Sequence, residues 1–276
     1  MRFGGTLVNK TGRAAKNICM AASTEGAAKQ EKTALGNFCF VFLSRKDPVN
    51  FMKKTCALWR LVPLYTLVPL ISMVAVNAVT YYATRILTTD MYHHHITLSV
   101  DGHIPFVKEF IIIYVLAYLQ WGIGFVLTAR ESRAVCYRFI SAEAVAKLLC
   151  MLVFLAFPTT MQRADVTGQL VGSDFCSMLT RLIYASDRPD NLFPSIHCLE
   201  SWILFRASLK MKKTGKGYRI FSFVFALLVF ASTVLVKQHV AVDILGGVAV
   251  AEIGLWLSDK IGAGRIYKRI NDRLKV

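Results

Sequence analysis

Apolar residues dominate six stretches of the chain, and polar and charged residues gather between them. A transmembrane helix needs about 20 mostly apolar residues, a length that every stretch except the fourth approaches. The predicted spans cover residues 61–82, 106–128, 141–158, 196–209, 220–236 and 240–261. The fourth stretch is short and contains polar residues, so we expect neighbouring helices to shield it from lipid.

Basic residues alternate between the two sides that six spans would create. They are concentrated before the first span, between the second and third, between the fourth and fifth, and after the sixth. The other connections are very short, nearly free of charge, or balanced by Asp residues. Because Lys and Arg collect in cytoplasmic loops, this pattern predicts an all-α, polytopic membrane protein: a six-transmembrane-helix bundle with both termini cytoplasmic.

The composition agrees with this topology. Hydrophobic residues make up 55% of the chain, above the roughly 45–50% that is usual for soluble proteins. Cytoplasmic loops account for the formal net charge of +16 without a nucleic-acid partner. We expect a basic cytoplasmic tail (1–55) without the apolar segment of a signal peptide, a membrane catalytic domain (56–262) and a basic cytoplasmic tail (263–276). The apolar patch 38–43 is expected either to lie on the membrane surface or to pack against the protein.

Candidate catalytic residues fall at the predicted outer ends of the spans. His239 and Asp243 are four residues apart at the start of the sixth span, so they share one helical face. Asp243 can accept a hydrogen bond from one ring nitrogen of His239 and leave the other nitrogen free to act as a base or nucleophile. Lys237 stands beside them as a cation for an anionic substrate. The alternative interpretation is an interfacial histidine beside a helix-capping aspartate.

A second candidate group opens the fourth span. Ser195 is a good N-cap residue, and a helix N-terminus offers free N–H groups to an anion. His197 falls in the first turn, where it is placed to protonate a leaving group. The alternative is an ordinary capped helix with a histidine at the interface.

Arginines on the same side complete the set. Arg163 follows the third span, and its forked donors suit phosphate oxygens. Arg181 and Arg188 compete for the same role. Two histidines, an aspartate and several cationic or donor groups thus fall on one side of the membrane, a combination that favours a phosphoryl substrate.

The ordered set Arg163, Pro194-Ser195-Ile196-His197 and Ser232…His239…Asp243 resembles the type 2 phosphatidic acid phosphatase superfamily. The pattern of that family is a Lys…Arg-Pro motif, then Pro-Ser-Gly-His, then Ser-Arg…His…Asp. In this chain Ile196 replaces the Gly of the second motif and Thr233 replaces the Arg of the third.

The first motif departs furthest from the family pattern. Arg163 is followed by Ala164 rather than by Pro, whereas Arg181 precedes Arg188-Pro189 by the family's spacing, with Arg in place of Lys. We favour Arg163, because its surroundings are similar to a subgroup that includes inositol phosphorylceramide synthase-like proteins. Members of that subgroup are phosphotransferases, so the resemblance leaves hydrolysis and transfer both open.

The resemblance implies a role for each matching residue. His239 would attack phosphorus and form a phosphohistidine, and Asp243 would orient and polarise it. His197 would protonate the leaving group and then activate water or an acceptor alcohol. Lys237, Ser195 and Arg163 would hold the phosphoryl oxygens.

Several other features bear on the site. No metal or cofactor is expected, because the carboxylates do not cluster as Mg²⁺ ligands would, and the run His93-His94-His95 shows no tetrahedral ligand set. Glu143 and Lys147 are expected to form a structural ion pair. A disulfide between Cys176 and Cys198, which could both face outside, is left open.

The sequence therefore predicts metal-independent hydrolysis of a lipid phosphate or diphosphate at the outer face of the membrane. Membrane lipids are the other expected partners, and no nucleic-acid partner is expected. Transfer of a phosphorylated head group between lipids is the alternative within the same class. A transporter or a non-catalytic lipid-binding protein is the alternative from another class. A bacterial inner membrane is the expected location, and the oligomeric state is left open.

Overall fold

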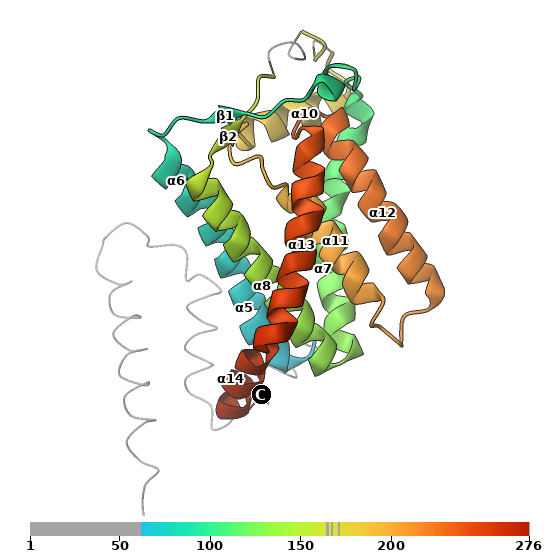
Figure 1. The fold of residues 1–276 in the computed structure, drawn as a ribbon. Helices are drawn as coiled ribbons and strands as arrows, with labels where there is room; N and C mark the ends of the chain where they lie inside the picture. Colours follow the sequence, from blue (N-terminus) through green and yellow to red (C-terminus); the bar gives the residue numbers. More distant parts are fainter. Residues whose placement is uncertain (1–61, 164–165, 167, 171, 276) are drawn as a thin grey trace, which may run out of the picture. The chain divides into compact units, whose positions relative to one another are not determined.

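The computed structural model describes residues 62–163, 166, 168–170 and 172–275, so the predicted tail 1–55 and the patch 38–43 lie outside the described residues. The described chain is almost entirely helical, and its long helices run side by side as a bundle (Figure 1). Five helices are long and apolar enough to cross a membrane: Leu64–Thr88, Lys108–Glu131, Arg133–Ala156, Lys216–Leu235 and Ala241–Ile261. The chain is therefore an all-α polytopic membrane protein, as the sequence predicts.

The first of these helices changes its winding along its length. It consists of the 3-10 turn η1 (Leu64–Thr66), α5 (Leu67–Ala78), the π-helical segment η2 (Val79–Ala83) and α6 (Thr84–Thr88). The others are α7 (Ile111–Glu131) with the preceding 3-10 turn η4 (Lys108–Phe110), α8 (Arg133–Ala156), α12 (Lys216–Leu235) and α13 (Ala241–Ile261).

The fourth predicted span is helix α11 (Ile196–Ser208), which has 13 residues. At about 1.5 Å per residue it covers only about 20 Å. It packs against α7, α8, α12 and α13, and most of its side chains are buried. Its neighbours thus shield its polar residues from lipid.

The third span begins earlier than the sequence predicts. Helix α8 starts at Arg133 rather than at residue 141, because the Ser132 hydroxyl accepts the Val135 N–H at 3.2 Å and caps the helix there. Arg138, expected in a loop, lies on α8 and pairs with Asp259 of α13, with its Nε 2.8 Å from Oδ1. Hydropathy locates only the apolar part of such a helix, since its polar end continues beyond the apolar run.

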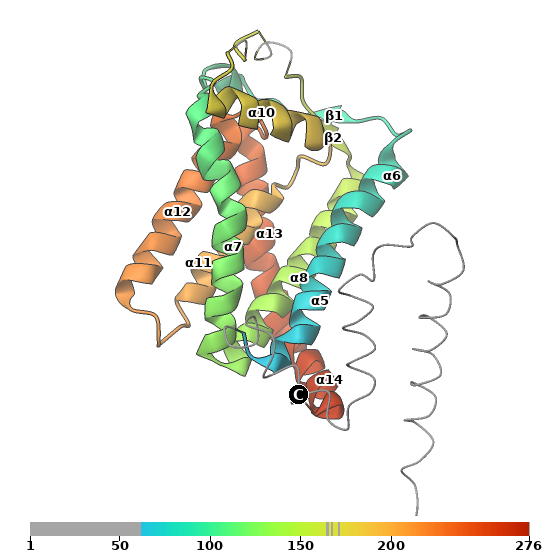
Figure 2. The ribbon, with the colours of Figure 1, turned by 180° about the vertical axis from the view of Figure 1, so that it is seen from behind.

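Helix α10 (Phe175–Ser186) lies across one end of the bundle, where the sequence predicts only a connection (Figure 2). Next to it, β1 (His94–His95) pairs in parallel with β2 (Thr159–Thr160). A further 3-10 turn, η3 (Ser99–Gly102), belongs to the loop that follows β1. We call this end of the bundle the site end.

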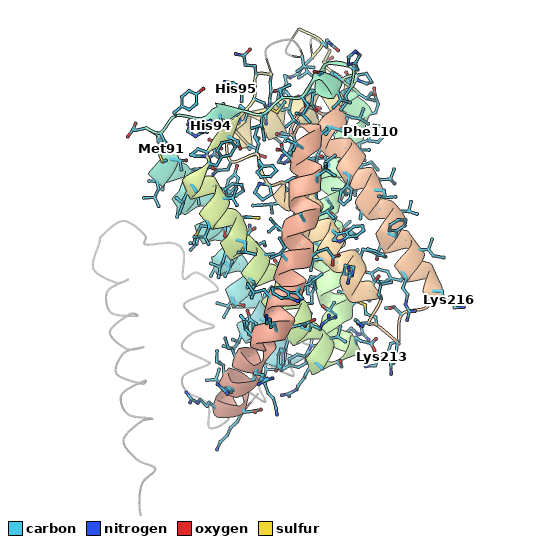
Figure 3. All side chains as sticks on the ribbon, viewed as in Figure 1. Met91, His94, His95, Phe110, Lys213 and Lys216 are labelled. Atoms are coloured by element: carbon cyan, nitrogen blue, oxygen red, sulfur yellow. The ribbon has the colours of Figure 1, made fainter. Side chains whose placement is uncertain are left out.

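The opposite end of the bundle carries basic residues of the α7–α8 connection, of the α11–α12 connection and of the C-terminal segment. The C-terminal helix α14 (Gly264–Leu274) lies there (Figure 1). Lys213, between α11 and α12, and Lys216, the first residue of α12, are also at this end, away from His94 and Phe110 (Figure 3).

The cysteines do not form the disulfide that the sequence left open. Cys176 and Cys198 are both free thiols. Cys198 is fully buried in α11, with its sulfur 3.9 Å from the Thr233 hydroxyl, whereas Cys176 lies on α10. Their positions along the chain are compatible with a pair, but the packing of α11 turns Cys198 into the bundle.

Candidate active site

His239 and Asp243 meet at the start of α13. Nδ1 of His239 lies 3.0 Å from Oδ2 of Asp243, and the same oxygen accepts the Val240 N–H at 3.0 Å. Asp243 is fully buried, and His239 is 8% exposed. The carboxylate therefore orients the imidazole through Nδ1 and leaves Nε2 available for chemistry.

The turn between α12 and α13 holds His239 in position. The carbonyl of Thr233 accepts the N–H groups of Gln238 at 2.9 Å and His239 at 3.0 Å. Lys237 adopts the left-handed conformation, with a φ of 50°. A left-handed residue is common just after the end of a helix, although it is usually Gly or Asn. The turn thus ends α12 and presents His239 before α13 begins.

Ser195 and His197 are brought to His239 by the start of α11. The Ser195 hydroxyl accepts the Cys198 N–H at 3.4 Å, which is the N-cap that the sequence predicts. The Ser195 N–H donates to the carbonyl of Asp243 at 3.1 Å. Gly247 on α13 permits this approach, because a Cβ at that position would lie 2.6 Å from the Ser195 carbonyl oxygen. The two helix starts therefore touch through their backbones.

Aromatic side chains of α7 surround His197. Its Nε2 lies 3.1 Å from the Tyr118 hydroxyl, and its ring stacks on Tyr114 with centroids 4.2 Å apart. Trp121 approaches the same ring at 5.1 Å, and His239 at 6.2 Å. None of these three aromatic residues was predicted from the sequence to belong to the site. Their spacing at positions 114, 118 and 121, on one face of an apolar helix, was the available signal.

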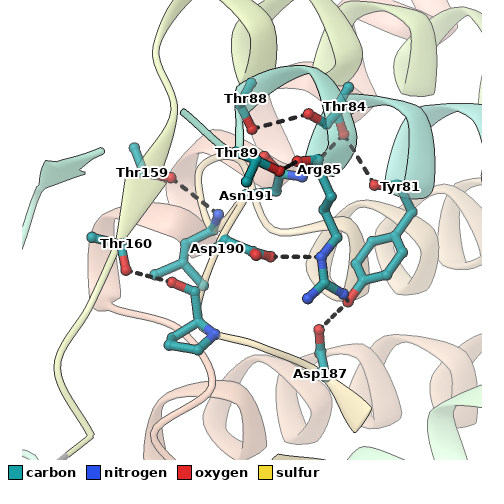
Figure 4. Close-up of polar contacts among 12 residues, drawn as sticks. Tyr81, Thr84, Arg85, Thr88, Thr89, Thr159, Thr160, Asp187, Asp190 and Asn191 are labelled. Atoms are coloured by element: carbon teal, nitrogen blue, oxygen red, sulfur yellow. Dashed lines mark hydrogen bonds and ion pairs between the residues drawn. The ribbon is translucent and has the colours of Figure 1, made fainter. Parts of the chain in front are cut away.

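A polar network fixes the segment that leads into α11 (Figure 4). Arg85 of α6 pairs with Asp190 at 3.1 Å and donates to the Tyr81 hydroxyl at 2.7 Å. The Tyr81 hydroxyl in turn donates to Asp187. The Thr159 hydroxyl accepts the Leu192 N–H at 3.0 Å. The first span and β2 thus anchor the connection from α10 to α11.

Both histidines line one cavity of about 290 Å³, which we call the inner cavity. Its described polar lining also includes Gln238, Asp187 and Arg188. Its apolar and aromatic lining includes Tyr82, Tyr118, Trp121, Ile183, Leu192 and Ile196. The first and second spans both contribute, so the cavity extends between them below α10.

The three candidate arginines lie in different environments. Arg188 is exposed and lines the inner cavity. Arg163 donates to the carbonyl of Asp187 at 2.9 Å, to the carbonyl of Lys237 at 3.1 Å and to the Gln238 side chain, and it lies over the Tyr184 ring. Its burial lowers the pKa of the guanidinium below the usual value. Arg163 therefore links the segment before α11 to the turn that carries His239.

Arg181 and Lys237 point away from the inner cavity. Arg181 donates to the carbonyls of Leu170 and Gly172, which lie in the loop before α10. Lys237 donates to the carbonyls of Ile104 at 2.6 Å and Asp101 at 3.3 Å. Partial burial lowers the pKa of the Lys237 ammonium group.

This arrangement combines the parts of a histidine-dependent phosphotransfer site inside a membrane bundle. One imidazole is oriented by a buried carboxylate, a second imidazole lies in the same cavity, and a helix N-terminus and an arginine lie beside them. Among the described residues, no three His, Cys, Asp or Glu side chains come together as a metal-ligand set.

Comparison with known proteins agrees with this class. Residues 85–257 match the PAP2 superfamily, and the chain belongs to that superfamily. No curated protein and no solved structure matches the chain. PAP2 proteins are in general phosphatases and phosphotransferases that act on phosphate esters, so this general activity extends to the chain.

Proposed function

We propose that the protein is a metal-independent phosphatase that hydrolyses a lipid phosphate or diphosphate through a phosphohistidine intermediate. The observation that carries the proposal is that His239 and His197 line one cavity, while Asp243 holds Nδ1 of His239 at 3.0 Å. This pairing leaves one imidazole nitrogen as the nucleophile and supplies a second imidazole as the acid.

In the first step, Nε2 of His239 attacks phosphorus and the bond from phosphorus to the lipid oxygen breaks. His197 gives its proton to that oxygen, so the lipid leaves as an alcohol or, from a diphosphate, as a protonated phosphate. Asp243 stabilises the positive charge that develops on His239. Arg188 and the N–H groups at the start of α11 stabilise the charge on the phosphoryl oxygens.

In the second step, a water molecule attacks phosphorus and gives its proton to His197. The bond between phosphorus and Nε2 breaks, His239 returns to its neutral form, and phosphate is released. Because His239 must be neutral to attack phosphorus and His197 must be protonated to act as the acid, we expect a bell-shaped dependence of the rate on pH.

Three of the candidate residues are assigned supporting roles. Ser195 caps α11 and keeps its free N–H groups directed toward the cavity. Arg163 acts as a positioning residue, since its donors already bind Asp187, Lys237 and Gln238. Lys237 supplies positive charge next to His239. Arg181, bound to the loop before α10, takes no part in the reaction that we propose.

The lining of the inner cavity supports a lipid substrate. It includes aromatic side chains of the first and second spans, such as Tyr82 and Trp121, and the aliphatic side chain of Ile196 on α11. An alkyl chain entering between these spans would keep its contact with lipid while the phosphate reaches His239. The basic loops at the opposite end favour a site that faces outside, for example from a bacterial inner membrane.

Transfer of a phosphorylated head group is the second candidate function. Its first step is the same, but a lipid alcohol replaces water in the second step. A transporter is disfavoured, because the candidate residues lie at the end of the spans rather than at their middle. A non-catalytic lipid-binding protein would keep the cavity but lack turnover.

The test is phosphate release from a panel of lipid phosphates and diphosphates in detergent with EDTA present, for the wild type and His239→Ala. We expect release that survives EDTA and falls on the order of a thousandfold or more in the variant. Acid-labile phosphate bound to the wild-type protein, and absent from His239→Ala, would identify the intermediate. If no lipid releases phosphate and no added lipid alcohol accepts a head group, the proposal is wrong.

A further inference from the structure

An open cavity of about 300 Å³ lies at the end of the bundle opposite the site end, where α8, α13 and α14 meet (Figure 1). We call it the far cavity. Its described lining includes two buried hydroxyl groups, and Ser258 of α13 donates to Ser141 of α8 at 2.9 Å. The far cavity is at the other end of α13 from His239, so the reaction that we propose does not use it.

Positive charge predominates around the far cavity. Its described lining contains three basic side chains, Arg138, Arg265 and Lys268, and one acidic side chain, Asp259. Asp259 is already paired with Arg138, whose Nε lies 2.8 Å from Oδ1. Within the part of the chain that the structure describes, the side chains of Arg265 and Lys268 form no hydrogen bond or ion pair. Two cations of the lining therefore remain available to an anion.

The turn between α13 and α14 keeps Arg265 beside the far cavity. Gly262 ends α13 in the left-handed conformation, with a φ of 65°, and its N–H donates to the carbonyl of Asp259 at 3.2 Å. A Cβ at Gly262 would lie 2.8 Å from Nε of Arg265. The guanidinium therefore folds back over the backbone of Gly262, which itself lines the cavity.

Neighbouring side chains place the far cavity at the level of lipid head groups. Trp256 of α13 is 60% exposed, and Nζ of Lys260 lies 4.7 Å from the centroid of its ring. An exposed tryptophan and a lysine near the end of a span are typical of the membrane interface. Ser258 and Asp259 follow Trp256 on the same helix, so the cavity lies within one turn of this level.

Helix α14 carries a second indication of a lipid surface. Its buried residues Tyr267 and Asn271 dock on the bundle. Ile266, Ile270 and Leu274 are exposed, and their four-residue spacing places them in one stripe along the helix. An exposed apolar stripe beside basic residues is typical of a helix that lies in the membrane interface. This stripe favours a lipid over a soluble acidic peptide as the occupant of the neighbouring cavity.

We propose that the far cavity binds the phosphate group of an anionic phospholipid from the leaflet opposite the site end. Arg265 and Lys268 donate to the phosphate oxygens, and the acyl chains extend into the membrane beside Trp256. Because α8, α13 and α14 all line the cavity, the bound phosphate holds the ends of these three helices together. A ligand that binds only the folded protein raises its melting temperature. The site is independent of the proposed reaction.

The test is the melting temperature of the full-length protein in detergent, titrated with short-chain phosphatidylglycerol. The protein carries His239→Ala, so that no probe is consumed. We expect phosphatidylglycerol to raise the melting temperature by several degrees. Short-chain phosphatidylcholine, whose choline cation is repelled by the basic lining, and inorganic phosphate, which lacks acyl chains, should need about tenfold higher concentrations for the same rise.

Paired variants in the same background locate the site. Arg265→Gln with Lys268→Gln should need about tenfold more phosphatidylglycerol for the same rise, because two charge-assisted contacts are lost. Arg269→Gln with Arg273→Gln removes the same charge from exposed positions of α14 outside the described lining, and should stay within about threefold of the parent. Ala134→Glu adds a negative charge to the lining and should weaken binding, whereas Ala134→Gln, of equal size, should not.

Several outcomes would overturn the proposal. An equal loss in the two double variants would mean that only the total charge of α14 matters. Equal titrations of Ala134→Glu and Ala134→Gln would show that the anion does not occupy the far cavity. A rise that phosphatidylcholine matches would exclude selection of an anionic lipid, and one that inorganic phosphate matches would exclude a lipid as the ligand. None of these outcomes bears on turnover by His239, so the proposed function would stand or fall separately.

Discussion

Two pairs of oppositely charged or chargeable side chains lie inside the bundle with the same four-residue spacing. On α8, Lys147 donates to Glu143 at 2.6 Å, and at the start of α13, His239 bonds to Asp243 at 3.0 Å. Both pairs are almost fully buried. Spacing and burial therefore do not distinguish the structural pair from the pair that we propose to be catalytic.

The surroundings of the two pairs differ. Lys147 also pairs with Glu200 of α11, so its buried ammonium group lies between two carboxylates. The Glu143 pair does not line the inner cavity, whereas His239 does. A buried charge pair that no substrate can reach can only hold helices together. The same kind of pair at the wall of a cavity can react.

The largest expected difference comes from removing the negative charge of each pair. Asp243→Asn should lower turnover by about 10²–10⁴-fold, because the amide neither fixes the reactive tautomer of His239 nor stabilises its positive charge. Glu143→Gln, the matched change in the other pair, should leave turnover within a few-fold of the wild type. Steady-state rates of the two purified variants check this. An equal loss of turnover in a well-folded Glu143→Gln protein would contradict the division into a structural pair and a reactive pair.

Removing the cation from the structural pair should affect stability instead. Lys147→Met leaves two glutamates facing each other in the bundle, and we expect a loss of about 3–5 kcal/mol in the free energy of unfolding. Unfolding in detergent measures it. Lys237→Met, at the site end, should cost less than about 1.5 kcal/mol, since only hydrogen bonds to two carbonyls are lost. As a control, the triple variant Glu143→Gln, Lys147→Met and Glu200→Gln removes the unpaired carboxylates. If it were no more stable than Lys147→Met, unpaired negative charge would not be the cause of the lost stability.

Backbone contact at the site should be sensitive to a single methyl group. Gly247→Ala places a Cβ 2.6 Å from the Ser195 carbonyl oxygen and 2.9 Å from Cys198 Cβ. We expect a loss of about 1–3 kcal/mol in stability and a fall in turnover, because the start of α11 carries His197. Gly217→Ala, where the added Cβ meets no neighbour, is the control. Unchanged melting temperature and turnover in Gly247→Ala would contradict the close approach of α11 and α13.

The smallest effect concerns pH and Lys237. A lysine keeps its charge below its pKa, and burial lowers the pKa of Lys237, so its charge is lost at a lower pH than that of an exposed lysine. If this charge assists the reaction, turnover falls as pH rises through that pKa. Arginine stays charged to far higher pH, so Lys237→Arg should remove this additional decline at alkaline pH and leave the limb set by His197 in place. Superimposable profiles would show that the Lys237 charge is not used.

Local physical chemistry determined much of this protein from the sequence. Long apolar stretches predicted the spans, because a helix in lipid must satisfy its backbone internally and present apolar side chains outward. The four-residue spacing predicted that His239 meets Asp243, and the N-cap preference of Ser195 predicted where α11 begins. These inferences need only helix geometry, which acts within one turn.

The tertiary structure decided which of the distant residues share a cavity. Arg163, Arg181 and Arg188 carry the same charge and lie in one connection, and the sequence favoured Arg163, yet of the three only Arg188 lines the inner cavity. Tyr118 reaches His197, and Glu200 joins Lys147, through the packing of α7, α8 and α11. The inner cavity likewise arises from loops and spans far apart in the chain. Contacts between helices depend on how whole faces pack, and sequence spacing carries no information about that beyond a single helix.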